Sequence, residues 1–153
     1  MNRQWLFKGE QLLQTFWVGG LLAVGYLAVP ILFQALDDRR LAGAVAGSMF
    51  SAISIVGFIC GGALLLSALM AAGGNWFKAR RVQVLLTMLC LVAIGFFVLQ
   101  PMMQTLKAAG YQPGSEAAMQ FGRLHGISSL LYLATSLLGV YLVMMQARSS
   151  GQA

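Results

Sequence analysis

Four long stretches without a single Asp, Glu, Lys or Arg constrain the fold of this chain more than any other feature. They cover residues 11–36, 41–77, 82–106 and 124–147. A helix rises about 1.5 Å per residue, so about 20 apolar residues cross a hydrocarbon core about 30 Å thick. Each stretch is long enough, and a charge at the membrane midplane would cost several kcal/mol. We therefore expect an all-α membrane protein built as a bundle of four transmembrane helices.

The composition agrees, because only 9% of the 153 residues are charged, against about a quarter in soluble domains. We expect one domain, residues 1–153, with spans at about 11–36, 41–72, 82–106 and 116–146. The second and fourth helices are longer than a straight span needs, so they should tilt or project from the membrane. Each half of the chain has a span with a late proline, a short loop and an overlong helix. This layout would suit two hairpins related as a parallel repeat, although chance agreement is the alternative.

The basic residues lie in the short connections between the spans rather than on one soluble face. The net charge of +6 therefore predicts topology and not a nucleic-acid partner. If the first span starts inside, the inner segments hold more Lys and Arg than the outer loops. This favours an integral protein of the bacterial inner membrane with both termini in the cytoplasm. The expected partner is the lipid bilayer, with a homo-oligomer or a small membrane partner left open.

No enzyme signature is present in the sequence. The uncharged stretches hold no acidic residue, and neither a zinc-protease motif, nor paired carboxylates, nor a phosphate-binding loop occurs. We therefore expect no catalytic residues and no enzyme activity. Cys60 and Cys90 both fall inside predicted spans, where a free thiol behaves as a small hydrophobic group.

Polar groups gather at the outer level of three predicted helices. Pro30 and Pro101 should kink the first and third helices and free backbone carbonyls there. His125 is the only histidine, and it should lie at a similar depth on the fourth helix. We predict an outer polar site that contains His125, Ser128, Ser129, Tyr132, Gln34, Gln100 and Gln104. The simpler alternative is that the hydroxyls pack helices together and His125 anchors a helix end.

Methionines at the same level raise the question of a soft metal. Met102 and Met103 lie beside the predicted outer site, and thioethers together with a neutral imidazole bind ions such as Cu(I). Binding through His125 should weaken at acidic pH, because a protonated imidazole cannot coordinate a metal. The alternative is that the methionines fill the core. No other cofactor is expected.

Small residues recur every three or four positions along the second helix. Gly43, Gly47, Gly57 and Gly61, with two serines between them, form one smooth stripe. Such stripes allow membrane helices to approach closely. We therefore expect this helix to be central and to use the glycines for helix packing.

Three short segments carry a resemblance to a known family. Residues 121–130 (FGRLHGISSL), 30–33 (PILF) and 42–50, which include GSMF, resemble the domain of unknown function 4149 family in order and spacing. Its eukaryotic members are the transmembrane protein 205-like proteins, and the CopD-type copper-resistance membrane proteins are more distantly similar. The resemblance implies a four-helix membrane protein linked to metal or metallodrug tolerance. This chain has Tyr132 where the family often has Asn.

Two functions follow from these patterns. The protein handles or transports a solute or a soft metal ion at an outer-facing polar site, or it is a non-catalytic structural or partner-binding membrane protein. A polar cavity between the prolines and His125 would favour the first function. A dry and fully packed interior would favour the second.

Overall fold

The computed structural model describes residues 3–110, 112 and 114–150, and every regular element in this part of the chain is helical. The first hairpin consists of α1 (Arg3–Leu22), η1 (Ala23–Ala28), α2 (Val29–Ala35) and α3 (Arg39–Ala72). After the connecting turn η2 (Gly73–Lys78), the second hairpin consists of α4 (Arg80–Ile94), η3 (Gly95–Leu99), α5 (Gln100–Ala109) and α6 (Glu116–Ser150). The predicted all-α architecture is confirmed.

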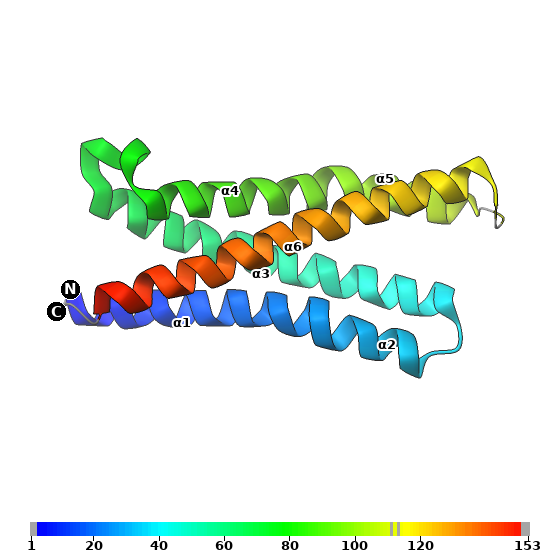
Figure 1. The fold of residues 1–153 in the computed structure, drawn as a ribbon, viewed down its shortest axis with the longest axis horizontal. Helices are drawn as coiled ribbons and strands as arrows, with labels where there is room; N and C mark the ends of the chain where they lie inside the picture. Colours follow the sequence, from blue (N-terminus) through cyan, green and yellow to red (C-terminus); the bar gives the residue numbers. More distant parts are fainter. Residues whose placement is uncertain (1–2, 111, 113, 151–153) are drawn as a thin grey trace.

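These elements form four rods that are long and apolar enough to cross a membrane. They are Trp5–Ala35, Arg39–Lys78, Arg80–Ala109 and Glu116–Gln146, so the chain is an integral membrane protein. Adjacent rods run in opposite directions, and α1 begins at the same end of the bundle at which α6 ends (Figure 1). We call this end the proximal end. The distal end carries the α2–α3 and α5–α6 connections.

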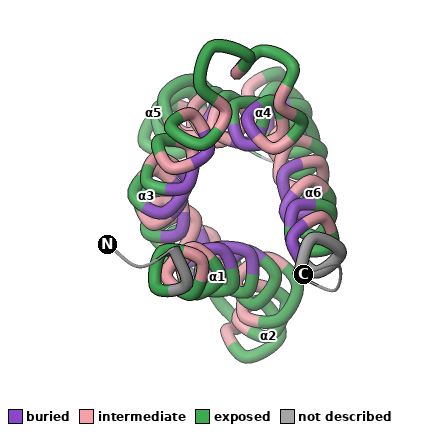
Figure 2. Tube along the Cα trace, turned by 90° about the vertical axis from the view of Figure 1, so that its left-hand side faces the viewer, coloured by how far each residue is buried: buried purple, intermediate pink, exposed green. Residues whose placement is uncertain are grey.

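The rods form a ring in which α3 packs on α1 and α4, and α6 packs on the same two helices from the other side. Seen from the proximal end, the buried residues face the centre of this ring and the exposed residues face outward (Figure 2). Many exposed residues are large and apolar, among them Leu12, Phe16, Ile59, Met70 and Leu130. An apolar outer surface of this kind is suited to contact with lipid.

The tightest packing lies in the proximal half of the ring. Trp17 of α1 is fully buried and inserts beside Gly57 and Gly61 of α3. A Cβ atom added to Gly57 would lie 2.7 Å from Nε1 of Trp17, so nothing larger than glycine fits there without displacement. Around Trp17 the core is completed by Leu64, Leu85, Met88 and Leu142.

Two wide π-helical turns interrupt the first and third rods. In η1 the N–H of Val29 bonds to the carbonyl of Val24, and at η3 the N–H of Gln100 bonds to the carbonyl of Gly95. Each wide turn ends two residues before a proline, Pro30 or Pro101. Proline lacks the N–H that would continue the α-helical ladder, so the pattern shifts in the preceding turn. Beyond η1, α2 diverges from α6 toward the distal end (Figure 1).

Side-chain caps mark the starts of two helices. The carboxylate of Asp38 accepts hydrogen bonds from the N–H groups of Arg40 and Leu41, which caps α3. Ser115 accepts a hydrogen bond from the N–H of Ala118 at the start of α6.

The helix α1 begins at Arg3, well before the uncharged stretch that starts at residue 11. Absence of charge marks the apolar part of a helix, and the helix itself continues into the polar region.

Candidate functional site

A cavity of about 1230 Å³ occupies the distal half of the ring. Its walls come from all four rods: η1 and α2, the first half of α3, η3 with α5, and the first half of α6. The small residues of α3 and the wide turns η1 and η3 lie at this depth. The cavity therefore forms where close helix packing ends and the rods separate.

Five of the seven residues predicted for an outer polar site line this cavity. They are Gln100, His125, Ser128, Ser129 and Tyr132. Ser129 donates a hydrogen bond to the carbonyl of His125 within its own helix, at 2.9 Å. The ring of His125 is stacked at 6.2 Å from that of Phe121, one turn earlier. One face of α6 thus brings four of these polar groups to the cavity, and Gln100 comes from α5.

Tyr132 ties α6 to the wide turn of the first rod. Its hydroxyl donates to the carbonyl of Leu21, just before that turn, at 2.6 Å. A Cβ atom on Gly25 would lie 2.2 Å from the Tyr132 ring, so glycine is required where the two helices meet. Phe50 of α3 packs edge-on against the same ring at 5.0 Å. Tyr132 therefore forms the junction of three walls.

The glycine stripe of α3 has two different environments. Gly57 and Gly61 pack against Trp17, whereas Gly43 and Gly47 line the cavity. The carbonyl of Gly47 accepts a hydrogen bond from the Gln100 side chain at 3.1 Å, and the carbonyl of Gly43 accepts one from Nζ of Lys107 at 3.1 Å. In the distal half, side chains of α5 thus bridge to α3 through backbone carbonyls.

The remaining predicted site residues lie elsewhere. Gln34, Gln104 and Met102 are exposed and are not part of the cavity wall. Adjacent residues on a helix point about 100° apart, and here Met102 is exposed while Met103 is turned toward the ring. Met103 lines the cavity, and the prolines themselves do not.

The structure brings together few metal donors. In the described part of the chain no three His, Cys, Asp or Glu residues gather where they could hold an ion. Of the predicted soft-metal ligands, His125 and Met103 line the same cavity. We therefore find two of the three predicted donors in one place.

Basic side chains form part of the cavity wall, although none of them was among the residues predicted for the site. Arg39 and Arg40 at the start of α3 and Lys107 near the end of α5 all line the cavity. Neither Asp nor Glu is among the described lining residues. Lys107 also lies 5.5 Å from the centre of the Phe121 ring. In the sequence these cations were indistinguishable from topology determinants, because only the fold places them at one mouth.

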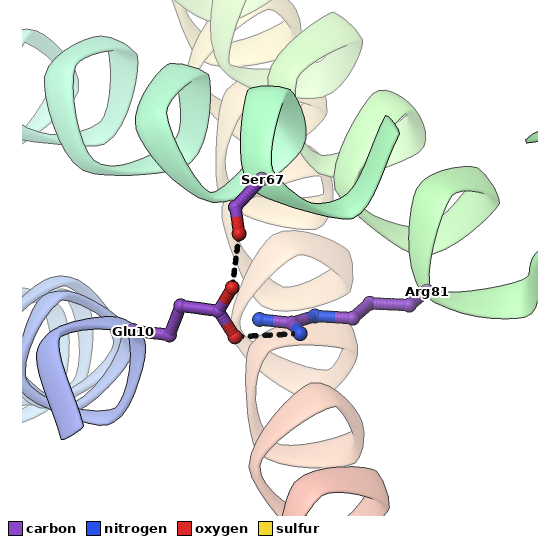
Figure 3. Close-up of polar contacts among 3 residues, drawn as sticks. All are labelled: Glu10, Ser67 and Arg81. Carbon is purple, nitrogen blue, oxygen red and sulfur yellow. Dashed lines mark hydrogen bonds and ion pairs between the residues drawn. The ribbon is translucent and has the colours of Figure 1, made fainter. Parts of the chain in front are cut away.

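The proximal side of the cavity is closed by two successive layers. The first is the apolar core around Trp17, and the second is an ion pair at 2.8 Å between Glu10 of α1 and Arg81 of α4. The Glu10 carboxylate also accepts a hydrogen bond from Ser67 of α3 (Figure 3). Gln14, between Glu10 and Trp17 on the same face of α1, is buried, and its Oε1 has no partner in the described structure.

Glu10 lies one residue before the uncharged stretch at residues 11–36 and was not among the residues predicted for a site. Its spacing carried a usable signal. Glu10, Gln14, Trp17 and Leu21 recur at intervals of four, three and four residues, which places them on one helix face. A polar start to an otherwise apolar inward face predicts an interhelical polar contact at the membrane boundary.

A comparison with protein-family models shows which family the chain belongs to. A family model described as Domain of unknown function (DUF4149) matches residues 12–112. The chain belongs to the DUF4149 family. The DUF4149 match includes the motifs at residues 30–33 and 47–50, and it ends before the third motif at residues 121–130.

Three walls of the cavity lie within the DUF4149 match, namely those from the first rod, α3 and α5. The fourth wall, which carries His125 and Tyr132, lies outside it. No curated protein and no solved structure matches the chain. Kinship with the transmembrane protein 205-like and CopD-type proteins therefore stays a prediction.

Proposed function

We propose that this protein binds a solute with an apolar body and a polar group in the distal cavity. The observation that supports this proposal is the cavity of about 1230 Å³. Typical small-molecule sites have roughly 300–1,000 Å³, so the cavity has room for such a solute. Its wall combines apolar side chains such as Phe50, Leu91 and Val92 with hydroxyl, amide and imidazole groups. Apolar lining with a few convergent polar groups is characteristic of binding sites.

The side chains that line the cavity favour a solute over a soft metal ion. His125 and Met103 supply only two soft or borderline donors, and Met102 is exposed. The extended apolar wall has no role in coordinating a single ion. An organic solute uses both parts of the wall.

Fluorescence quenching of Trp17 would test this function. Trp17 lies one helical turn from Leu21, which lines the deep end of the cavity. Replacing Trp5 and Trp76 with Phe leaves Trp17 as the only indole. We expect 12-bromododecan-1-ol to quench its emission saturably in a neutral detergent, because the bromine at the end of the bound chain approaches the cavity floor.

A cavity-filling substitution provides the matched comparison. Gly47 lines the cavity, and a Cβ atom there meets nothing within 4 Å, so Gly47→Phe should fill the space and abolish the saturable quenching. Gly19 also has open space around it but does not line the cavity, so Gly19→Phe should leave quenching unchanged. Equal quenching in both variants would contradict binding in the cavity and favour a structural or partner-binding role.

A further inference from the structure

We infer that the ligand of the distal cavity is an amphiphile with an anionic head, a carboxylate or a phosphate, held at the cationic mouth formed by Arg39, Arg40 and Lys107. The inference rests on the proposed function and specifies its ligand class. Two observations support it: the polarity of the cavity wall and the depth of the cavity.

The polarity of the wall is graded along the membrane normal. Arg39 and Arg40 begin the long helix α3, and Lys107 lies in the last turn of α5, so all three cations belong to the distal mouth. The deep end is lined by Leu21, Leu91 and Val92, and the hydroxyls of Ser54 and Thr135 there donate to carbonyls of their own helices. A ligand that satisfies both ends has a charged head and an apolar tail.

The described lining residues at the mouth include two arginines and one lysine but no carboxylate, so the basic groups set the sign of its charge. The nearby carboxylate of Asp38 is engaged in capping α3, where it accepts from the N–H groups of Arg40 and Leu41. The Lys107 ammonium has three donors, and its contact with Gly43 uses one of them. An anionic oxygen is the complementary partner, because charge-assisted hydrogen bonds are stronger than neutral ones.

The depth of the cavity suits an acyl chain. Along α3 the lining runs from Arg39 to Ser54, which corresponds to roughly 22 Å at about 1.5 Å per residue. One leaflet of the hydrocarbon core is about 15 Å thick. A chain anchored by its head at the mouth therefore lies entirely within the cavity wall.

Head-group charge can be varied while the tail stays constant. In the variant with Trp17 alone, 12-bromododecanoate should quench saturably with an apparent Kd about tenfold or more below that of 12-bromododecan-1-ol, as expected for hydrogen bonds to charged groups. The cationic 12-bromododecyltrimethylammonium should not quench saturably. Equal affinity for the three heads would overturn the ligand class and leave solute binding intact. Absence of saturable quenching by all three would overturn the proposed function as well.

Substitutions of the basic residues at the mouth test whether these residues cause the preference for an anionic head. We expect binding of 12-bromododecanoate to be about tenfold weaker in Lys107→Gln and also in the double variant Arg39→Gln/Arg40→Gln. The conservative variant Lys107→Arg should retain binding. Arg123→Gln removes a cation from the same end of the bundle but not from the cavity wall, so it should have no effect. If Arg123→Gln weakened binding as much as Lys107→Gln, general surface charge would explain the selectivity and the inference would fail.

The anionic head can belong to a free fatty acid or to a membrane phospholipid. Nanodiscs of phosphatidylcholine that contain phosphatidylglycerol with brominated acyl chains separate these sources. If the brominated phosphatidylglycerol quenches Trp17, and if Lys107→Gln reduces this quenching, the head bound at the mouth belongs to a phospholipid. Quenching by 12-bromododecanoate alone would identify a single-chain carboxylate, and both results support the anionic class.

Discussion

At the scale of single residues, the decisive contact is the insertion of Trp17 between the glycines of α3. The sequence indicated that Gly57 and Gly61 belong to a smooth helix face, but not which side chain would fill it. Trp17 is fully buried and cannot move aside easily. The space left by two missing side chains is thus occupied by the largest side chain of the neighbouring helix.

Gly57→Leu should destabilise the bundle, because its Cβ alone would lie 2.7 Å from Nε1 of Trp17. We expect a loss of roughly 1–3 kcal/mol, as for other overpacked cores. A thermal melt in detergent measures the change. Gly62→Leu is the matched control, since a Cβ at Gly62 meets nothing within 4 Å. An equal effect of the two substitutions would show that helix propensity, and not packing on Trp17, governs the result.

The sequence identified one wall of the candidate site better than the others. His125, Ser128 and Tyr132 recur at helical spacing, so their common face on α6 followed from periodicity alone. Arg39 and Lys107 are far apart in the sequence, and no periodicity joins residues on different helices. Gln34 and Gln104 were included because of their depth along the helix, whereas the direction of a side chain also depends on its rotation about the helix axis.

At the scale of elements, the structure shows why the prolines matter. The sequence predicted kinks at Pro30 and Pro101, and the structure has π-helical turns just before both residues. The width of a helical turn depends on which carbonyl each N–H selects, and residue type alone does not decide this. Both hairpins thus have a wide turn before the late proline, and their relation as a parallel repeat stays a prediction.

The ion pair between Glu10 and Arg81 joins the first and third rods at the proximal end. The Glu10 side chain is only 16% exposed, so removal of one partner leaves a poorly hydrated charge. We expect Glu10→Gln and Arg81→Gln to destabilise the bundle individually, and the double variant to lose less than the sum. A double-mutant cycle from thermal or denaturant melts should give a coupling of about 0.5–3 kcal/mol. Strict additivity would mean that the pair contributes no net interaction.

At the scale of the whole molecule, the arrangement of four spans follows almost entirely from the uncharged stretches. Apolar length determines how many times a chain crosses a membrane. The ring order of the helices and the cavity depend instead on which faces pack. Those faces were predicted only for α3 and α6, where small or polar residues recur, although the spacing of Glu10, Gln14, Trp17 and Leu21 also marks the inward face of α1.

We expect the proximal end to face the cytoplasm, because Lys8, Lys78, Arg80 and Arg81 cluster there and the basic side of short loops stays inside. Reporter fusions after Ala153 measure this. A fluorescent protein should be bright and a periplasmic phosphatase inactive at that position. An active phosphatase together with a dark fluorescent reporter would reverse the orientation.

The closed floor beneath the cavity determines how its contents exchange. If the proposed ligand enters at the distal mouth, the deepest side chain of the first rod that it meets is Leu21, and the apolar layer around Trp17 lies beyond. Its occupancy would then follow the concentration on one side of the membrane only. Passage to the other side would require Trp17 to leave its glycine notch and the Glu10–Arg81 pair to separate.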